Sequence, residues 1–418
     1  MGSSKKINPD ILIWIGYSGM FFFVPLAHSP VEICGGLVLA AWILSGKFLT
    51  DTRMWLSSET ALPVLFLILL PWIGLAYSPM PSDGLHVASK GYYWLYAIGM
   101  VSVLGEQKHP DFVIKMFLAG LALSSVVSAL QVLGLVRLRY GTPSGLLGIS
   151  SPWITYSLLL TVGILIASFY FQKAQGRKGR YLSLFMMLLY FGTIGFVGGR
   201  SGYLAFIILS PLLVYNIIGR RHILRILLLS LLAVALLFTF PVVRTRFGEI
   251  KKDIERYEQG DISTSIGLRL HMWGIALTEI KKNPVFGIGT EGFKKSWEVN
   301  KQDPALPFHA HPHNSFLYMM VSYGLGGLIA FCWLLVVMLR KGWKNREIPL
   351  GFALLSFTLV LIIGSLTDTQ ILPFPTATAY VLFAGIAGAI GAGDNRLSRT
   401  IAMTKEEELP PACARRTS

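Results

Sequence analysis

The chain has 418 residues, of which 53% are hydrophobic and only 14% are charged, and its formal net charge is +15. A soluble domain has roughly a quarter charged residues, so this composition excludes a soluble protein and predicts an all-α integral membrane protein. The excess of Lys and Arg lies mostly in short loops, as in other membrane proteins, which argues against a nucleic-acid-binding surface. The three cysteines are scattered, so neither disulfides nor a cysteine metal site are expected.

Apolar segments recur along the whole chain. A helix that crosses a bilayer needs about 20 mostly apolar residues, and twelve segments meet or approach this length. The second and the eighth are short, and the fourth carries Lys90 near its start. The twelve expected transmembrane segments are residues 9–27, 31–46, 60–77, 88–105, 111–135, 152–171, 181–198, 201–218, 222–242, 314–339, 349–367 and 372–392.

The distribution of Lys and Arg predicts the orientation of these segments. If the N-terminus is cytoplasmic, the cytoplasmic segments carry 22 of the 37 Lys and Arg residues, and the short outer loops carry 4. Cytoplasmic loops of membrane proteins are enriched in Lys and Arg. Both termini are therefore expected in the cytoplasm, with residues 243–313 on the outer side of the membrane.

The long outer segment is expected to contain two helices. Residues 244–261 (RTRFGEIKKDIERYEQGD) place Glu and Lys at helical spacing and predict a charged helix. Residues 263–284 predict an amphipathic helix that ends at an Asn-Pro pair, and residues 286–293 (FGIGTEGF) predict a Gly-rich turn. An apolar stripe on such a helix usually packs against the rest of the protein. The stripe consists of Leu268, Met272, Ile275 and Ile280.

These patterns divide the chain into four parts. Residues 1–242 contain transmembrane helices one to nine, and residues 314–392 contain helices ten to twelve. Between them, residues 243–313 form the outer loop with its helices and a histidine-rich segment. Residues 393–418 are polar and are expected to form a disordered cytoplasmic tail.

Several cations lie on the outer side, where the charge rule disfavours them. Arg200 closes the seventh segment in the run FVGGRSGY. The small residues around it are expected to let backbone approach a ligand closely, and the helix that follows offers its N-terminus to an anion. An arginine beside a helix N-terminus is suited to binding phosphate. The alternative is an interfacial arginine that reaches the lipid headgroups.

Other outer loops carry Arg137 and Arg139, Lys90, and Arg269. Together these cations predict an anion site at the outer leaflet. A polyprenyl diphosphate lipid fits such a site, and so does an ordinary phospholipid headgroup.

The run HAHPHNSF, residues 309–316, holds three of the eight histidines. Pro312 prevents a helix before His313, and the apolar run that follows makes Asn314 or Ser315 a plausible N-cap. His313 is therefore expected at the N-terminus of the tenth segment, at the outer membrane face.

Three interpretations of this histidine segment remain open from the residues alone. A metal site is disfavoured because HExxH and paired cysteines are absent from the sequence. The second interpretation is a catalytic base. The helix N-terminus and the nearby arginines disfavour the charged imidazolium, so the imidazole stays neutral near pH 7, which is the form that a general base needs. The third interpretation is a turn histidine that only hydrogen-bonds the backbone.

The histidine also begins a longer motif, and two arginine motifs accompany it. His313 and Asn314 are followed by nine residues, a glycine, two residues and a second glycine. Arg269 is followed four residues later by Trp273, then by a proline and a Gly-Ile-Gly turn, while Arg200 lies in a small-residue turn after a mid-chain segment. The glycines of these motifs are Gly324 and Gly327, and Gly287 and Gly289.

In their order and membrane side, the three motifs resemble those of the O-antigen ligase family, within the superfamily of O-antigen ligases and polymerases. The resemblance covers essentially the whole chain. It implies the fold of the GT-C class of membrane glycosyltransferases and a multi-pass location in the bacterial inner membrane, with a periplasmic active site. It also implies transfer of O-antigen polysaccharide from undecaprenyl diphosphate to a sugar hydroxyl of lipid A-core, by an inverting reaction that needs no metal or other cofactor.

The resemblance also implies residue roles. His313 would be the base that activates the acceptor hydroxyl, and Arg200 and Arg269 would bind the diphosphate and stabilise its developing charge. Asp368, in the run SLTDTQILPF, would orient a partner, and His311 and Asn314 would take lesser parts in substrate binding. Arg137 and Arg139 are added as substrate-binding residues on the basis of their side and charge alone.

Two other functions remain open. An O-antigen polymerase would share the fold and donor but would use a lipid-linked glycan as acceptor. A transporter of lipid-linked glycans would place charged or broken helices near the membrane midplane, whereas here the unpaired ionisable residues cluster at the outer ends of the segments.

Overall fold

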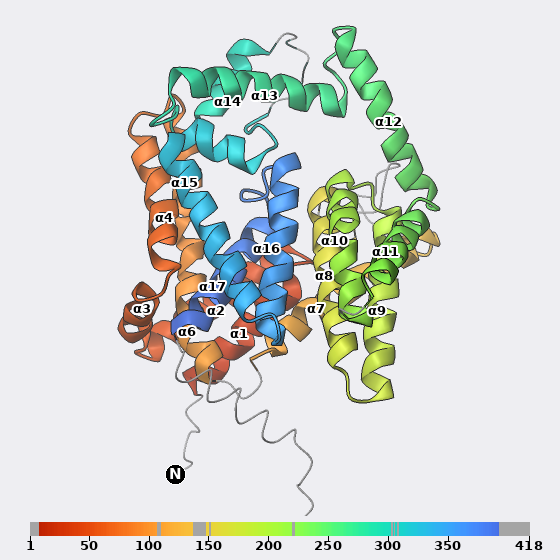
Figure 1. Ribbon diagram of the computed structural model, residues 1–418. Helices are drawn as coiled ribbons and strands as arrows, with labels where there is room; N and C mark the ends of the chain where they lie inside the picture. The colour runs from red at the N-terminus through yellow and green to blue at the C-terminus, as the bar shows by residue number, and fades with distance from the viewer. Residues whose placement is uncertain are drawn as a thin grey trace, which may run out of the picture.

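The structure is a computed structural model that describes residues 8–106, 110–136, 148–149, 152–219, 222–301, 304, 306 and 309–392. Within these ranges every regular element is a helix (Figure 1). Arg137, Arg139 and the expected tail, residues 393–418, lie outside the described residues. The predicted all-α fold class is confirmed for the part of the chain that is described.

The helices in chain order are α1 (Pro9–Phe23), α2 (His28–Leu44), α3 (Phe48–Leu56), α4 (Ala61–Leu75), α5 (Pro81–Ser89), the 3-10 helix η1 (Lys90–Tyr93), α6 (Trp94–Glu106), α7 (Phe112–Val132), α8 (Trp153–Lys173), α9 (Arg177–Phe196), α10 (Arg200–Ile218), α11 (Ile223–Leu237), α12 (Pro241–Glu258), α13 (Ser265–Lys282), α14 (Gly292–Asn300), α15 (Ser315–Lys344), α16 (Pro349–Thr367) and α17 (Thr376–Ala392).

Each of the twelve predicted segments contains a helix, but not all of these helices are long enough to cross a bilayer alone. Six are long and apolar enough, namely α7, α8, α9, α10, α15 and α16. The pairs α2–α3 and α11–α12, bent by 103° and 90°, raise the number to at most eight. Helices α1, α4 and α17 are apolar but shorter. The chain is thus a multi-pass membrane protein, while the count of twelve and the GT-C fold stay predictions.

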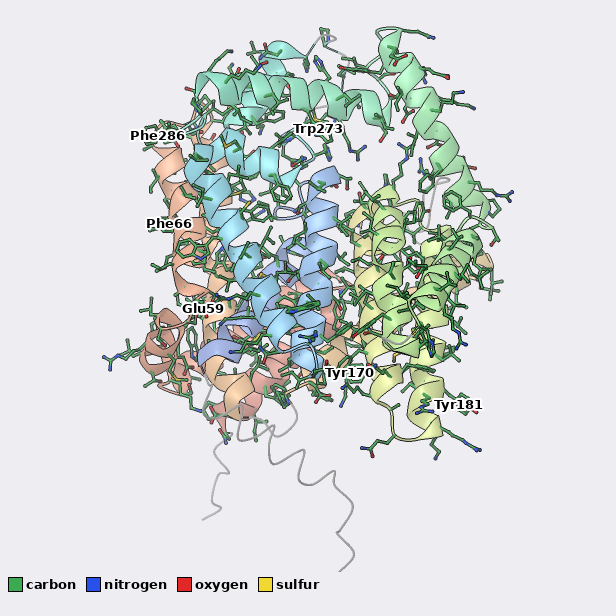
Figure 2. All side chains as sticks on the ribbon, viewed as in Figure 1. Glu59, Phe66, Tyr170, Tyr181, Trp273 and Phe286 are labelled. Atoms are coloured by element: carbon green, nitrogen blue, oxygen red, sulfur yellow. The ribbon has the colours of Figure 1, made fainter. Side chains whose placement is uncertain are left out.

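The centre of the bundle is formed by α8 and α16, which are buried along most of their length. Stacked rings join them, with the centroids of Phe169 and Phe352 4.9 Å apart. The outward faces of α4, α9 and α11 are apolar and exposed, as Phe66 on α4 illustrates (Figure 2). Such faces are expected where a bundle meets lipid.

Helices α12, α13 and α14 form a layer at one end of the bundle, here called the cap (Figure 1). The two expected helices of the outer loop are confirmed as α12 and α13, and α13 ends at Asn283 as predicted. Thr264 caps the start of α13 by accepting a hydrogen bond from the Gly267 amide at 3.1 Å. The short helices α3, α5 and α14 were not expected, because nine residues carry too little apolar periodicity to identify a helix.

The apolar stripe of α13 lies against its neighbours, as expected. Met272 and Ile275 are buried in a small core with Phe293 and Trp297 of α14 and Val321 of α15, and Leu268 and Ile280 lie at its edge. Burial of this stripe stabilises the position of α13 over α15.

Backbone hydrogen bonds attach the same part of the cap to a break in α15. Gly324 has φ 63° and ψ −156°, which interrupts the helix and frees the carbonyls of the preceding turn. The amides of Ile288 and Gly289 donate to the carbonyls of Val321 and Ser322 at 2.9 and 3.0 Å. The predicted Gly-rich turn is therefore confirmed, and it serves as the joint between the cap and α15.

The break also explains one motif glycine. A Cβ on Gly324 would lie 2.1 Å from the carbonyl oxygen of Val285. On the far side of the turn, Thr290 makes two hydrogen bonds to α4. Its backbone amide donates to the Gly74 carbonyl at 3.2 Å, and its side-chain hydroxyl donates to the Pro71 carbonyl at 2.7 Å. The turn is thus held between α4 and α15.

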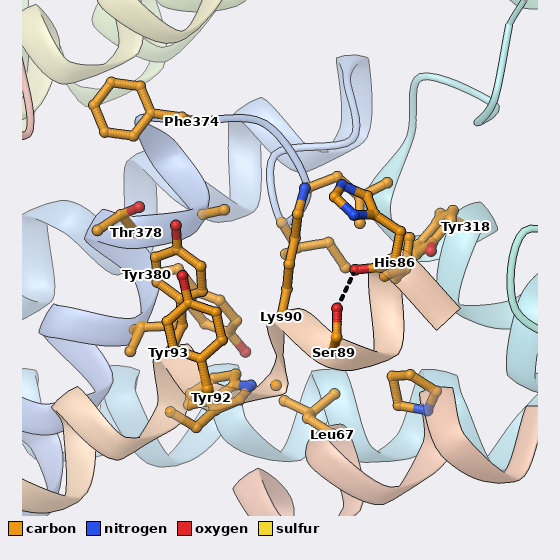
Figure 3. A pocket seen from close by; sticks show the side chains of 18 of the residues that line it. Leu67, His86, Ser89, Lys90, Tyr92, Tyr93, Tyr318, Phe374, Thr378 and Tyr380 are labelled. Atoms are coloured by element: carbon orange, nitrogen blue, oxygen red, sulfur yellow. Dashed lines mark hydrogen bonds between the residues drawn. The ribbon is translucent and has the colours of Figure 1, made fainter. Parts of the chain in front are cut away.

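A cavity of about 770 Å³ lies below this joint, between α2, α4, α5, η1, α15 and α17 (Figure 3). Eight of its 23 lining residues are Tyr, Trp or Phe. It is separate from the histidine segment, which lies on the cap side of α15.

Candidate active site

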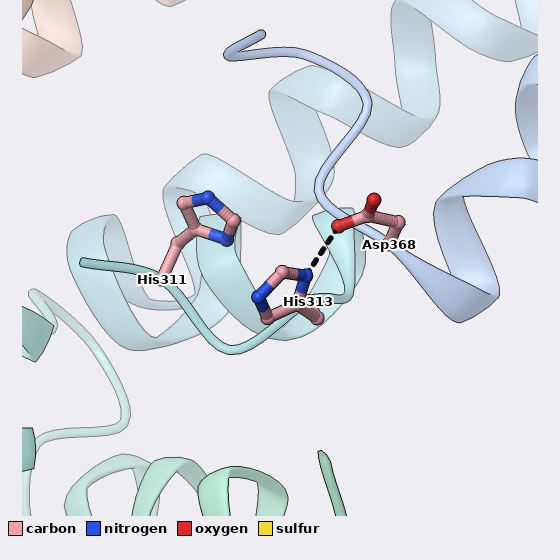
Figure 4. Close-up of side chains that lie close together, drawn as sticks. All are labelled: His311, His313 and Asp368. Carbon is pink, nitrogen blue, oxygen red and sulfur yellow. Dashed lines mark hydrogen bonds and ion pairs between the residues drawn. The ribbon is translucent and has the colours of Figure 1, made fainter. Parts of the chain in front are cut away.

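His313 and Asp368 form a hydrogen-bonded pair beneath the cap (Figure 4). His313 directly precedes the N-cap of α15, Asp368 directly follows α16, and the distance from Nδ1 to Oδ1 is 2.6 Å. Burial alone raises the pKa of Asp368, but the His313 hydrogen bond, the charge of the neighbouring imidazoles and the Thr369 amide hold this pKa below its usual range. Asp368 is therefore an ionised acceptor, His313 Nδ1 carries the proton, and Nε2 is left free to accept one.

The backbone holds His313 in a strained conformation. Its φ of 49° lies in the left-handed region, which costs a residue other than glycine about 1–3 kcal/mol. The residue before it is fixed from the cap, because the indole Nε1 of Trp273 donates to the Pro312 carbonyl at 2.9 Å. Strain of this kind persists only where surrounding contacts enforce it, and it gathers at functional sites.

Asn314 starts α15 and ties it to the loop that carries Asp368. Its Oδ1 accepts from the Phe316 and Leu317 amides at 2.9 and 3.0 Å, which confirms the predicted N-cap. Its Nδ2 donates to the Leu366 carbonyl at 3.0 Å, and its backbone amide donates to Thr369 Oγ1 at 3.1 Å. The side chain is thus occupied within the protein, and its part in substrate binding stays a prediction.

His309 and His311 pack around His313. The centroid of the His313 ring lies 5.4 Å from that of His309 and 4.6 Å from that of His311. Burial, followed by the charges of nearby groups, lowers the pKa of each flanking histidine to about 4, so both are neutral at pH 7. Within the described residues, His309 Nε2 and His311 Nδ1 are buried and have no hydrogen-bond partner.

His311, His313 and Asp368 could in principle hold a metal ion, because each offers a ligand atom within 4.8 Å of the others. The Nδ1–Oδ1 distance of 2.6 Å is, however, a hydrogen-bond distance. Two ligands of one tetrahedral zinc lie roughly 3.4 Å apart at normal bond lengths. A direct hydrogen bond therefore fits this pair better than a shared ion.

Arg269 lies on α13, and its charge interacts with that of Asp368. Its Nη1 donates to the Ser265 carbonyl and hydroxyl, at 2.9 and 2.6 Å, whereas its buried Nε has no partner among the described residues. Burial lowers the pKa of Arg269. The negative charges of Asp368 and Asp253 raise this pKa, and the positive charge of Arg200 lowers it. The two arginines and Asp368 thus lie close enough to influence one another, and Arg269 keeps unused hydrogen-bonding capacity.

Arg200 is the first residue of α10, and acidic side chains of α12 contact it. Its Nη2 lies 2.8 Å from Glu249 Oε2, and its Nη1 lies 3.3 Å from Asp253 Oδ2. The close approach of a ligand to the glycines beside it stays a prediction, and one of them has a packing role. A Cβ on Gly199 would lie 2.1 Å from Ser157 Oγ, so this glycine permits close packing of α10 on α8.

Residues 185–332 match the model of the family described as O-antigen ligase. The matched segment is similar to that family. It contains the two arginines and all three histidines of the site, while Asp368 lies beyond its end.

A curated relative supports the same region without adding an activity. An uncharacterized protein of Haemophilus influenzae is 27% identical over 197 residues, which are 45% of this chain. The chain spans about half the length (49%) of this relative.

The structure brings most of the predicted site residues together. His311 and His313 lie beside Asp368, and Arg269 and Arg200 lie at the cap side of the same region. Lys90 does not belong to this group, because it lines the separate cavity. The predicted substrate-binding residues Arg137 and Arg139 cannot be placed, since they lie outside the described residues.

Sequence reasoning missed the acidic partners of Arg200 and the anchoring role of Trp273. Glu249 and Asp253 are four residues apart on α12, so one face of that helix is acidic. That spacing was visible in the sequence, but nothing there indicated that α12 folds back onto α10. The contact from Trp273 to Pro312 spans 39 residues and had no local signal.

Proposed function

We propose that this protein is an O-antigen ligase. In this proposal it transfers O-antigen polysaccharide from undecaprenyl diphosphate to a sugar hydroxyl of lipid A-core and completes lipopolysaccharide. The observation that carries the proposal is the hydrogen bond from His313 to Asp368, which directs His313 Nε2, together with the charge interaction of Asp368 with Arg269 and of Arg269 with Arg200. The family match supports the coarser assignment to a membrane glycosyltransferase of the ligase and polymerase type.

The reaction is an inverting displacement. His313 Nε2 accepts the proton of the acceptor hydroxyl while the hydroxyl oxygen forms a bond to the anomeric carbon of the donor. The bond from that carbon to the diphosphate oxygen breaks, and undecaprenyl diphosphate leaves with the electron pair. Asp368 stabilises the imidazolium that forms and keeps Nε2 directed at the acceptor.

The arginines provide for the leaving group. A diphosphate leaves more easily when its growing negative charge is met by fixed cations. Arg269, with its unpaired Nε, is suited to bind one phosphate directly. Arg200 binds the other once the substrate displaces Glu249 and Asp253.

This chemistry requires no metal or other cofactor in our proposal, because the two guanidinium groups neutralise the negative charge of the diphosphate in place of a metal ion. The partners are the lipid-linked O-antigen, the lipid A-core acceptor and membrane lipids. The reaction takes place at the periplasmic face of a bacterial inner membrane, with both termini in the cytoplasm.

Two alternatives remain. An O-antigen polymerase would use the same donor and the same base, and only the acceptor would differ. A transporter of lipid-linked glycans would have no use for a strained histidine paired with a carboxylate, so the geometry of His313 disfavours it.

The test is lipopolysaccharide banding on gels from a strain that lacks this gene and carries it on a plasmid. We expect the wild-type gene to restore the O-antigen ladder and His313→Ala to abolish it. His222→Ala serves as the matched control, because His222 is exposed just before α11 and distant from the site. Blots of the membrane fraction establish that all three proteins are inserted.

The background strain separates the alternatives. Loss of a ligase leaves unsubstituted core and accumulated long chains on the lipid carrier, whereas loss of a polymerase leaves core that bears single repeats. A full ladder from His313→Ala would refute the assignment of the base. Absence of a ladder with the wild-type gene would refute the ligase proposal itself.

A further inference from the structure

The aromatic cavity of about 770 Å³ is not part of the arginine and histidine site. Its volume is in the range of roughly 300–1,000 Å³ that small-molecule sites occupy. Figure 3 shows Lys90 and His86 on one side of it and the rings of Tyr92, Tyr93 and Tyr380 on the other. Apolar side chains such as Leu67, Met319, Phe331 and Val381 complete the lining. A ligand of this cavity is therefore amphipathic.

The cavity has a cation that no described side chain pairs directly. The Lys90 ammonium makes no hydrogen bond or ion pair within the described part of the chain, and neither does the His86 imidazole on the turn before it. The Glu291 carboxylate, which does not line the cavity, lies near enough for the charge of Lys90 to lower its pKa. The acidic residue of the lining, Glu32, is already engaged, since it accepts hydrogen bonds from Tyr92 at 3.0 Å and from Tyr93 and contacts His28 at 3.2 Å. The side near Lys90 is thus suited to a negative charge.

Deeper in the lining, a polar group is left unsatisfied. Tyr380 is 3% exposed, and its hydroxyl has no hydrogen-bond partner among the described residues. A buried hydroxyl without a partner costs free energy, so such groups usually meet a ligand or water. Aromatic rings surround it, with the centroids of Trp94 and Phe331 5.5 and 6.2 Å from that of Tyr380.

The cavity and the proposed active site share a wall. Tyr318 and Met319 of the cavity follow His313 on the first turns of α15, and Ile371 and Leu372 follow Asp368 in the same loop. The lining includes no residue of α8 to α13, which carry the two arginines. The chain that directly follows His313 and Asp368 therefore lines the cavity, whereas the arginine-bearing helices do not.

We propose that this cavity holds the anionic lipid end of the acceptor, with a phosphate at Lys90 and His86 and hydrocarbon against the aromatic wall. This inference rests on the proposed function. In a displacement at the anomeric carbon, the nucleophile and the leaving group lie on opposite sides of that carbon. The diphosphate of the donor is assigned to the arginines, so the acceptor enters from the side of His313 that faces the cavity.

The test measures lipid binding to the purified full-length protein in detergent. The probes are a phosphorylated lipid A-core glycolipid, its dephosphorylated form, undecaprenyl diphosphate and phosphatidylglycerol. Lys90→Glu is expected to weaken binding of the phosphorylated glycolipid about tenfold or more, because it places a negative charge next to a phosphate. Binding of undecaprenyl diphosphate is expected to stay unchanged.

Matched variants separate charge from folding. Lys90→Arg keeps the charge and is expected to retain glycolipid binding, and Lys295→Ala removes an exposed lysine of α14 that does not line the cavity. Ala377→Phe narrows the cavity from a partly exposed position and is expected to weaken glycolipid binding without changing that of undecaprenyl diphosphate. Thermal unfolding establishes that each variant is folded.

The outcomes decide between sources of the lipid. If Lys90→Glu weakens binding of undecaprenyl diphosphate and spares the glycolipid, the cavity belongs to the donor and the inference is overturned. Equal binding of phosphatidylglycerol, or equal binding of the dephosphorylated glycolipid, also overturns it. If the wild-type protein restores no ladder in cells yet binds the phosphorylated glycolipid through Lys90, the ligase proposal fails while the glycolipid site stands.

Discussion

The two parts of the cap are attached to the bundle in different ways. Helices α13 and α14 share an apolar core with α15, and the turn between them is hydrogen-bonded to the backbone of α15 and α4. Helix α12 fully buries only Val243, and it contacts α10 through the ion pairs of Arg200 and the stacked rings of Tyr203 and Phe247. Apolar packing and backbone hydrogen bonds resist salt and ligands, whereas partly exposed ion pairs are weak and screened. The first part is suited to hold a reacting group in place, and the second is suited to exchange partners.

The largest effect is expected at His313, which lies beneath the firmly attached helices α13 and α14. Asp368→Asn replaces the acceptor of the His313 Nδ1 proton by an amide that can donate, which allows the wrong imidazole tautomer. We expect the rate of transfer by the purified enzyme to fall about 10²–10⁴-fold, mostly in kcat. A loss confined to KM for the acceptor would indicate that Asp368 binds substrate rather than orienting the base.

The next effect is on the joint that attaches α13 and α14 to α15. Gly324→Ala adds a Cβ against the Val285 carbonyl at a positive φ, so we expect it to destabilise the cap by about 2 kcal/mol or more. Gly326→Ala, two residues later in the same helix, meets no atom within 4 Å and is the matched control. Hydrogen exchange of α13 and α14 measures the difference. Equal protection in the two variants would contradict the role of the joint.

A smaller effect is expected where the attachment is electrostatic. Glu249→Gln with Asp253→Asn frees Arg200, because both carboxylates that contact it are removed. Exposed ion pairs are worth about 0–1 kcal/mol, so binding of inorganic diphosphate is expected to tighten by up to about fivefold. The double variant should also lose part of its dependence on salt. Weaker binding would show that the carboxylates support the site rather than compete for it.

A further effect is on stability against pH. The pKa of His309 and of His311 is about 4 in the folded protein and about 6.5 in an unfolded chain. The unfolded chain therefore binds more protons between these values, and stability falls as pH drops from about 6.5 to about 4. We expect α13 and α14 to exchange faster at pH 5 than at pH 7, and His311→Asn to reduce this difference. An unchanged pH response in that variant would contradict the prediction.

Much of this arrangement could be predicted from the sequence. Apolar periodicity identified each segment that became a long helix, and the Asn314 cap followed from the change from a proline-rich run to an apolar one. The pairing of His313 with Asp368 joins residues 55 positions apart, and the family resemblance indicated only that Asp368 would orient a partner, without naming His313. The partners of Arg200 depend on the 90° bend between α11 and α12, which no local propensity encodes.

The break at Gly324 has a consequence for how the enzyme meets its surroundings. The turns of α15 that follow His313 end at the break and take their orientation from the cap, whereas the longer part of the helix follows the bundle. A change in bilayer thickness alters the tilt of long spans, and in an unbroken helix that tilt would displace His313. We expect the glycine to act as a pivot between this segment and the membrane, so that the geometry of the His313–Asp368 pair stays the same in bilayers of different thickness.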